Sequence, residues 1–457
     1  SDVYKRQILL RSILASLITI FVIILSILPS MGSAGLFGFD VNPPLIIAPI
    51  IILTIALAHS IHIISIAMTN MSEGMSRNQA VIESMKINFV PVFLTSLTTA
   101  IGMGGVNLGK IPAYSEMANT VVIGAAIGFI LSVTLLPSMF SLLPITARKR
   151  KSYVLHMLKN LGELIYKFKN RFILIISALC IAIFSLIPSL TFDDFFGSYF
   201  DRVPAWLEVK NVVDPEFGSS FYIFSDIKTN ETDGITDPEY LKKLDEFESW
   251  LITQDEVSDV STISDVIKTL HKNMNGGFDE YYKIPDDKAL IAQYLLLYEF
   301  SVPYGMDLKN QMTADKSDSR MLIRSNNNTS MEAVAFKKRV DQWLDENISP
   351  YNTNGVAGIP IMMPHLFVEN TRGLVIGLLI SFSFIILVVG SALRSVRYGI
   401  ISIVPNIIPF IVGFGLLALV ADMVTAAHQF AVLISCLLYT SDAADEGLGV
   451  DLGGRRI

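Results

Sequence analysis

The chain has 457 residues, of which 51% are hydrophobic and 17% are charged, and its mean hydropathy is +0.51. Soluble domains carry roughly 25% charged residues, so this composition excludes an ordinary soluble globular protein. The apolar residues fall in runs of roughly 20, long enough for helices to cross a hydrocarbon core about 30 Å thick. The sequence therefore predicts a polytopic α-helical membrane protein.

The two ends of the chain differ from the rest. The chain opens with SDVYKRQ, without an initiator methionine, and residues 436–441 read CLLYTS. One short DNA sequence can encode both strings, the first from one strand and the second from the complementary strand. A sequencing-library adapter that was translated by mistake would give this pattern. We therefore interpret residues 1–7 and 436–457 as adapter-derived and non-native, and the rest as a fragment. Without Cys436, Cys180 stands alone, which supports neither a disulfide framework nor a metal cluster.

Seven apolar segments are predicted to span the membrane. They are residues 13–38, 44–66, 88–108, 118–144, 171–190, 372–392 and 399–420. An eighth begins near residue 424 and is cut after Ser435. Residues 75–86, MSRNQAVIESMK, read as a short amphipathic helix in the loop between the second and third spans.

Basic residues in the short loops orient these spans, because Lys and Arg concentrate in cytoplasmic loops. They are Arg11, Arg148, Lys149, Arg150, Lys151, Arg394 and Arg397. Residues 146–170 are then a cytoplasmic basic linker, and residues 191–370 form a soluble domain on the opposite side. That domain has 16 Lys and Arg against 31 Asp and Glu, a net charge of −15, whereas the rest of the chain is +8. We read its charge as a solubility feature rather than an acidic binding surface.

The soluble domain reads as strand, helix, strand, twice over. Strands are expected in SSFYIFSDI, VSDVSTI, SRMLIRS and NGVAGIPI, and helices in DPEYLKKLDEFESWLI and TSMEAVAFKKRVDQWLDENI. Asp237 is a plausible N-cap of the first helix, and Thr329 followed by Glu332 marks the start of the second. A polar middle segment separates the halves. Two such units predict a split βαβ, ferredoxin-like sheet covered by helices on one face.

The second span contains the polar residues His59, Ser60 and His62 among apolar neighbours. The histidines are three apart and share one helix face. Ionisable groups at mid-membrane are costly, so these side chains should face protein or water. Three readings stay open: a proton-handling site, since histidine titrates near neutral pH; a neutral, hydrogen-bonded helix contact; and a metal site, which lacks an obvious third ligand.

Other spans carry hydroxyls, glycines and prolines. The third holds Thr95, Ser96, Thr98 and Thr99, which either hydrogen-bond within their own helix or donate to a relay on the second span. Glycines and prolines are assigned to helix packing and bending: Gly102, Gly124, Gly128, Pro405 and Pro409. Glu116 reads as an end-cap residue. No phosphate-binding glycine loop, Ser/His/Asp set or nucleic-acid patch is evident.

Similar residues occur at matching positions in the two membrane halves. Arg11-Ser12 before the first span matches Arg394-Ser395 before the seventh, and Asp40 after the first matches Asp422 after the seventh. Nearly constant spacing makes an internal duplication plausible, and such repeats are common in transporters.

Three stretches together resemble the resistance–nodulation–division (RND) superfamily. They are ALAHSIHII, LTSLTTAIGMGG followed by SEMANTVVIGAAIGFILSVTLLPSMF, and RSVRYGIISIVPNIIPFIVGFGLLAL. Within it, the chain is most similar to predicted exporters grouped with the mycobacterial large-membrane-protein (MMPL) and hopanoid-exporter families, which share a sterol-sensing-type (SSD) helix bundle. The resemblance covers nearly all of residues 8–435.

The resemblance implies half of a duplicated six-helix architecture. Residues 8–145 would be transmembrane helices three to six, residues 171–190 helix seven, residues 191–370 a periplasmic porter domain, and residues 371–435 helices eight to ten, truncated. It also implies a multi-pass protein of the bacterial inner membrane, not an enzyme. Such a protein uses the proton gradient rather than a cofactor to export lipids or hydrophobic compounds. A homo-oligomer or a periplasmic partner would fit, and nucleic acid would not.

The family usually places an aspartate in helix four, in a pattern like Ala-Asp-Ser-x-His. Here the matching run is Ala58-His59-Ser60-Ile61-His62, so histidine replaces the acid while Ser60 and His62 match. A proton relay would then involve His59, Ser60 and His62, with help from Thr98 and Thr99. Protonated histidine is positive, so it would need an anionic or polar partner, expected on helix ten.

Two further hypotheses belong to other classes. The first is a non-transporting, lipid-sensing or receptor-like protein that uses the same sterol-sensing-type bundle and needs no titratable pair. The second is a membrane enzyme that uses His59 and His62, which would require a nucleophile or more ligands nearby.

Overall fold

The computed structural model describes residues 12–146, 153–194, 203–214, 221–303, 307–326, 329–420, 423–425, 428–429 and 431. It divides into two compact units, residues 192–368 and the remainder of the chain, and the division falls within one long helix. Arg11, the four basic residues 148–151, Asp422, most of the eighth predicted span and both adapter-like ends lie outside the described residues.

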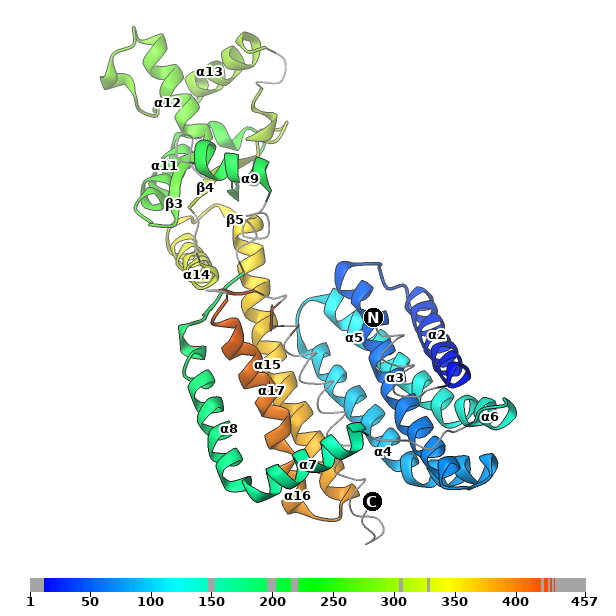
Figure 1. The fold of residues 1–457 in the computed structure, drawn as a ribbon. Coiled ribbons are helices and arrows are strands. Elements are labelled where there is room, and N and C mark those ends of the chain that lie inside the picture. The colour runs from blue at the N-terminus through cyan, green and yellow to red at the C-terminus, as the bar shows by residue number, and fades with distance from the viewer. Residues whose placement is uncertain are drawn as a thin grey trace. The chain divides into compact units, whose positions relative to one another are not determined.

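The first unit is a helical bundle. Its helices in Figure 1 are α2 (Ile13–Leu36), α3 (Pro43–Ser72), α4 (Arg77–Gly105), α5 (Pro112–Val133), α6 (Leu135–Leu142), α7 (Tyr153–Lys167), α8 (Lys169–Phe184), α15 (Ile359–Ala392, partly in the other unit), α16 (Val396–Ile401) and α17 (Ile403–Leu417). Two short strands, β1 (Thr191–Phe192) and β6 (Met423–Val424), lie outside the four-stranded sheet of the second unit.

Six helical segments in the described part of the chain are long and apolar enough to cross a membrane. They are Ile13–Leu36, Pro43–Ser72, Arg77–Leu108, Pro112–Leu142, Lys169–Ser189 and Ile359–Ala392. This confirms the predicted multi-pass helical membrane protein. The apolar part of α17, Ile407–Leu417, is shorter than these segments.

Helix α3 lies at the centre of the bundle, in contact with α2, α4 and α5 (Figure 1). Apolar residues that are almost fully buried join these helices, among them Ile52 of α3, Met103 of α4 and Val121 of α5. Burying such side chains is the main favourable contribution to packing in water. Within a membrane, by contrast, close van der Waals contact between helices takes over that role.

The structure corrects the predicted helix between the second and third spans. Residues 75–86 do not form a separate loop helix, because α4 starts at Arg77 and continues to Gly105. Ala80 and Val81 are buried, and the Ser84 hydroxyl donates to the Ile63 carbonyl at 2.6 Å. These contacts attach the first turns of α4 to α3. Because of this packing, the polar residues 77–86 form part of α4 and not a loop helix.

Two predicted spans are each broken into two helices. Residues 118–144 divide into α5 and α6 at Thr134, and residues 399–420 into α16 and α17 at Ser402. A proline cannot donate to the carbonyl four residues earlier. Pro137 and Pro405 stand four residues after Val133 and Ile401, where the first helix of each pair ends. Pro409 lies inside α17 without ending it.

The glycines of α5 give a matched pair for testing helix packing. A methyl group on Gly124 would lie 2.5 Å from the side chain of fully buried Ile52, whereas one on Gly128 would meet Ser26 at 3.6 Å, an ordinary contact. We expect Gly124→Ala to lower the free energy of unfolding of the bundle by about 1–3 kcal/mol. Gly128→Ala should be close to neutral. Thermal aggregation of the two variants in detergent, followed by size-exclusion chromatography, checks this; equal losses would contradict it.

The second unit is an α+β domain. Its elements are α9 (Pro204–Glu208), β2 (Tyr222–Lys228), α11 (Pro238–Ile252), β3 (Val257–Ser261), α12 (Ile263–Met274), α13 (Lys288–Ser301), β4 (Asp318–Ser325), α14 (Ser330–Asn347) and β5 (Asn352–Ala357). The four strands form one sheet in the order β3-β4-β2-β5, and each neighbouring pair is antiparallel. This is the order of a split βαβ, ferredoxin-like sheet, which confirms the predicted fold.

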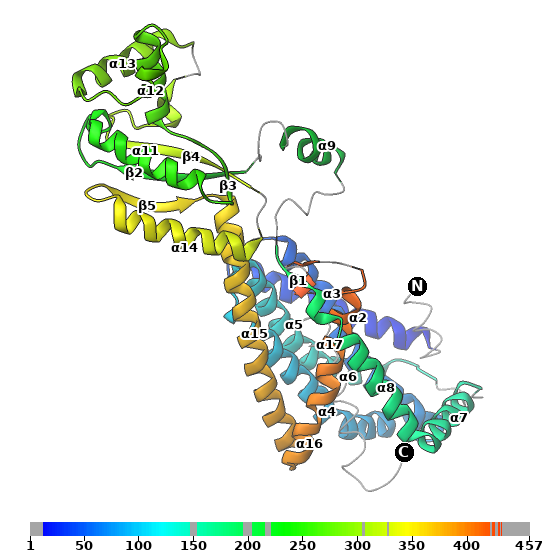
Figure 2. The same ribbon diagram turned by 90° about the vertical axis from the view of Figure 1, so that its left-hand side faces the viewer.

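The core of this domain lies between the sheet and two helices. Figure 2 shows α11 and α14 running along the sheet. The inward residues alternate along the strands, as in Ile223 and Ile227 of β2, and pack with Phe247 of α11 and Phe336 of α14. The predicted caps are present: Asp237 accepts the Glu239 amide, and Thr329 forms a capping box with Glu332. Helices α12 and α13 occupy the predicted polar middle segment.

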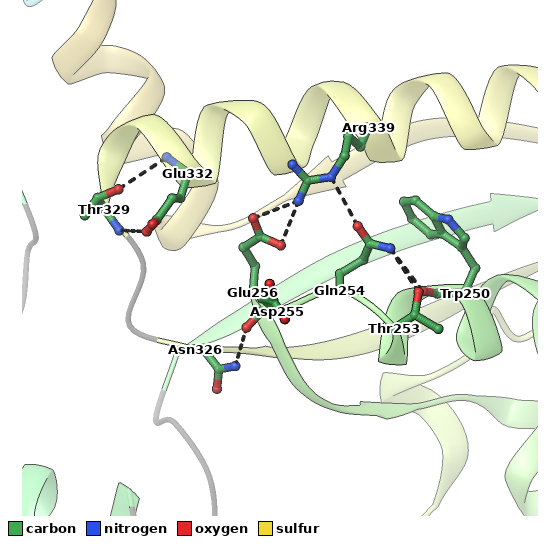
Figure 3. A network of polar contacts seen from close by, with 9 residues as sticks. All are labelled: Trp250, Thr253, Gln254, Asp255, Glu256, Asn326, Thr329, Glu332 and Arg339. Atoms are coloured by element: carbon green, nitrogen blue, oxygen red, sulfur yellow. Dashed lines mark hydrogen bonds and ion pairs between the residues drawn. The ribbon is translucent and has the colours of Figure 1, made fainter.

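A bidentate ion pair connects α14 to the start of β3 (Figure 3). Arg339 donates from Nη2 to both carboxylate oxygens of Glu256 at 2.7 and 2.8 Å, and from Nε to Gln254 at 3.1 Å. Asn326, at the end of β4, donates to the Asp255 carbonyl at 2.7 Å. Paired geometry of this kind fixes orientation better than a single contact. It positions α14 over the sheet.

A second charged cluster connects α11 to α12. Nζ of Lys268 lies 2.5 Å from Asp245, 2.9 Å from Asp265 and 3.9 Å from Glu248. Thr262 donates to Glu248 at 3.1 Å. Burial, followed by the negative charge of Asp265, raises the pKa of Glu248 to about 7, although Lys268 and Thr262 act in the opposite direction. Glu248 therefore binds its proton more tightly in the folded domain than in an unfolded chain.

This raised pKa predicts a pH dependence of stability. The contribution of Glu248 is fully present below its unfolded pKa of about 4.5 and is lost as pH rises through about 7. Glu248→Gln should remove this fall and stabilise the domain at pH 8 by about 1 kcal/mol, after allowing for solvent screening. All three tryptophans lie in residues 192–368, so tryptophan fluorescence during urea unfolding reports this unit. Parallel pH curves for the two proteins would contradict the prediction.

Candidate functional site

The polar residues of the second span lie where α3 meets α4. His59 is 16 residues from the start of α3 and 13 from its end, so it is near the middle of a membrane-crossing helix. Its side chain is 0% exposed. An imidazole at this depth is costly unless its nitrogens have partners, and the helix facing it supplies one.

That partner is Ser96 of α4. Its hydroxyl oxygen is 3.3 Å from Nε2 of His59, and it also donates to the Val92 carbonyl of its own helix at 3.1 Å. Nδ1 of His59 is buried and has no hydrogen-bond partner among the described residues. One ring nitrogen is therefore placed against a hydroxyl, while the other is buried without a hydrogen-bond partner among the described residues.

The structure places Ser60 and His62 differently. Ser60 is fully buried, but its hydroxyl donates to the Ala56 carbonyl one turn earlier at 2.8 Å. It therefore faces its own backbone. His62 is half-buried, one turn after His59 on the same helix face. The second histidine places a further titratable ring close to the first.

The threonine hydroxyls of α4 are of two kinds, hydrogen-bonded and unsatisfied. Thr95 donates to the Pro91 carbonyl at 2.9 Å and Thr98 to the Thr95 carbonyl at 3.1 Å, so both hydroxyls have acceptors inside their own helix. The Thr99 hydroxyl is buried without a hydrogen-bond partner in the described part of the chain. Ser96, which the relay assignment omitted, makes the contact with His59. Its position 37 residues from His59 gives no local sequence signal, because only the packing of α3 on α4 joins them.

The titratable groups of the spans are sparse. Between their ends, α2, α3, α8 and α17 contain no Asp or Glu, and Glu83 and Glu116 lie toward the starts of α4 and α5. Glu116 accepts a hydrogen bond from Asn42, the N-cap of α3, at 2.7 Å. It thus ties α5 to the start of α3 instead of capping its own helix. His59 and His62 are the histidines in the middle part of α3.

No group of three His, Cys, Asp or Glu in the described residues could hold a metal ion. The residue that contacts the His59 ring, Ser96, supplies a hydroxyl, whereas zinc sites use three or four nitrogen, sulfur or carboxylate ligands.

Pockets in residues 192–368 do not identify a substrate. One is lined mainly by apolar residues including Phe221, Phe336 and Met363, but its volume of about 30 Å³ suits a water molecule or two. A wider cleft of about 820 Å³ is lined by charged residues of both signs, among them Asp226, Lys228 and Arg320. Neither has the apolar volume that a lipid chain requires.

Comparison with known proteins matches part of the chain to a family. Residues 7–158 match the family model described as the MMPL family. This range contains α2 to α6 and both helices that carry the His59–Ser96 contact. No curated protein matches the chain.

Proposed function

We propose that this chain is an RND/MMPL-type transporter, a proton-driven exporter of lipids or other hydrophobic compounds, since residues 7–158 match the MMPL family model. The proposal places it in a bacterial inner membrane, with residues 191–370 on the periplasmic side. The family match and the six apolar segments support a membrane transporter. The proposed energy source rests on the site, and the proposed substrate class rests on the family resemblance.

The observation that carries the proposal is the placement of His59. It is a titratable ring, fully buried at mid-span, with one nitrogen against Ser96 and the other without a hydrogen-bond partner among the described residues. A residue that served only to pack helices would gain little from a ring whose second nitrogen stays unsatisfied, since such a group costs roughly 1–3 kcal/mol.

Proton movement at His59 would couple to helix movement as follows. In the neutral ring, one nitrogen donates and the other accepts. Because the Ser96 hydroxyl donates its one hydrogen to Val92, Nε2 is the nitrogen that donates to Ser96, and Nδ1 is the acceptor. When His59 gains a proton, both nitrogens become donors, and the proton on Nδ1 requires an acceptor. A rearrangement of α3 against its neighbours that supplies one is favoured by protonation and reversed by proton loss.

Transport in vesicles of defined composition tests the proposal. The full-length protein is reconstituted into liposomes with an imposed pH gradient, trapped pyranine to report proton flux, and phosphatidylethanolamine with a fluorescent acyl chain as the probe. We expect proton flux and probe movement that depend on each other and stop when a protonophore removes the gradient. Probe movement that is unchanged without the gradient would refute proton drive. Absence of both fluxes would favour the lipid-sensing, receptor-like alternative.

A further inference from the structure

The segment that leads from α7 into α8 presents an exposed apolar row. Leu161 and Leu164 are each 46% exposed, and Ile165 is 44% exposed. Their spacing of three and four residues puts them on one face of α7. Tyr166, at the end of the helix, is 76% exposed. A row of large apolar side chains on a helix face requires an apolar partner.

The same segment is strongly basic. Residues 148–171 contain eight Lys and Arg and one acid, Glu163, in a chain whose net charge is −7. A partner that covers this segment should therefore carry negative charge as well as apolar surface. The cytoplasmic surface of a biological membrane has both properties, because anionic head groups lie directly above the acyl chains.

Aromatic and basic side chains alternate where the two helices join. Nζ of Lys169 is 5.2 Å from the centre of the Tyr166 ring. Nζ of Lys167 and Cζ of Arg171 are each 5.5 Å from the centre of the Phe168 ring. These cation–π contacts hold the charged groups beside the rings while the charges stay exposed. Tyrosine and basic residues at such a position mark the membrane–water boundary.

The next helix fixes the depth of this junction. The apolar segment Lys169–Ser189 begins at the junction and is long enough to cross the hydrocarbon core (Figure 2). Its first residues must therefore lie near the level of the lipid head groups. The basic side chains of the junction are at phosphate depth, and the apolar row of α7 can enter the acyl-chain boundary beside them.

We propose that the α7–α8 junction is a binding site for anionic phospholipids of the leaflet that it faces. Lys167, Lys169 and Arg171 bind the phosphate groups, and the row of Leu161, Leu164 and Ile165 contacts the acyl chains. The site is independent of the proposed transport function: it concerns bilayer lipids that hold the junction at the membrane surface, not the compound exported. A face of this kind that packed on protein would instead need an acidic protein partner.

Local lipid quenching tests the site in the full-length protein. Gly162 is exposed on α7 with nothing within 4 Å of an added Cβ, so Gly162→Cys can carry a bimane label after Cys180 and the other native cysteines are replaced by serine. The protein is placed in phosphatidylcholine bilayers that contain brominated phosphatidylglycerol or brominated phosphatidylcholine. We expect phosphatidylglycerol to quench the label several times more strongly at equal mole fraction.

Three variants decide the outcome. The triple change Lys167→Gln, Lys169→Gln, Arg171→Gln should reduce the preference for phosphatidylglycerol at least about fivefold, the effect expected of one basic residue at a membrane surface. Lys167→Arg, Lys169→Arg, Arg171→Lys should keep it. The control Lys86→Gln, Lys110→Gln, Arg397→Gln, which removes exposed charge elsewhere in the bundle, should also keep it. A preference unchanged by the triple glutamine variant, or a label that neither lipid quenches, would overturn the proposal.

Discussion

Replacing His59 with glutamine is expected to abolish proton-coupled transport while leaving the bundle folded. Glutamine keeps a polar group against Ser96, which lies 3.3 Å from Nε2 in the native protein, but it cannot gain or lose a proton. The coupled component of probe movement in the liposome assay should fall to that of vesicles without protein, and the pH dependence should disappear. The melting temperature in detergent should change little, because one polar side chain replaces another in the same space.

Two serine variants separate the relay from packing. Ser96→Ala removes the hydroxyl at His59 and should shift the pH at which transport is half-maximal. Ser60→Ala removes a hydroxyl that bonds to its own helix through Ala56, and it should leave the pH profile unchanged. His59→Gln with full pH-dependent transport would end the assignment of His59. Equal effects of the two serine variants would show that the hydroxyls act through stability alone.

A single methyl group at Gly105 is expected to loosen the contact between α4 and α15. An added Cβ there would lie within van der Waals distance of the Ser381 hydroxyl and 2.7 Å from the carbonyl oxygen of Gly377, which is backbone and cannot move aside. A Cβ added at Gly377 would lie even closer to the carbonyl oxygen of Gly105. Gly105→Ala should therefore lower the free energy of unfolding by about 1–3 kcal/mol. Thermal aggregation in detergent, followed by fluorescence-detected size-exclusion chromatography, measures the loss.

The neighbouring glycine supplies the control. Gly104 is exposed and has nothing within 4 Å of an added Cβ. Gly104→Ala changes the same helix by the same methyl group, but alanine is the better helix former by roughly 0.5–1 kcal/mol. It should be neutral or slightly stabilising. Equal destabilisation by both variants would mean that the close approach of α4 and α15 does not limit stability.

Local sequence signals predicted most of the fold. Asp237 and Thr329 with Glu332 marked two helix starts correctly, because capping depends on residues three or fewer positions apart. The alternating strands predicted the ferredoxin-like sheet. Prediction was incomplete where tertiary contacts determine the helix boundary. Ser84 donates to the Ile63 carbonyl, and the polar segment around it forms part of α4. The helices α12 and α13 were read only as a polar middle segment.

The candidate site was predicted less completely than the fold. His59 stood out because a titratable residue in an apolar helix is costly wherever it lies. Its partner could not be identified, since four hydroxyls on α4 look alike in sequence. The structure places Ser96 at the ring, while Thr98 bonds to its own helix and Thr99 has no hydrogen-bond partner among the described residues. The choice depends on the rotation of α4 about its axis, which packing sets.

The proline breaks at Thr134 and Ser402 give the bundle an uneven mechanical stiffness. A helix resists bending through its ladder of backbone hydrogen bonds, and each break removes part of that ladder. The glycine contacts between α4 and α15 hold other helices at close range. Bending of the backbone should therefore concentrate at the two breaks, while the buried side chains of Leu136 and Phe140 keep α6 packed on its neighbours. The two breaks are the positions at which the bundle resists bending least.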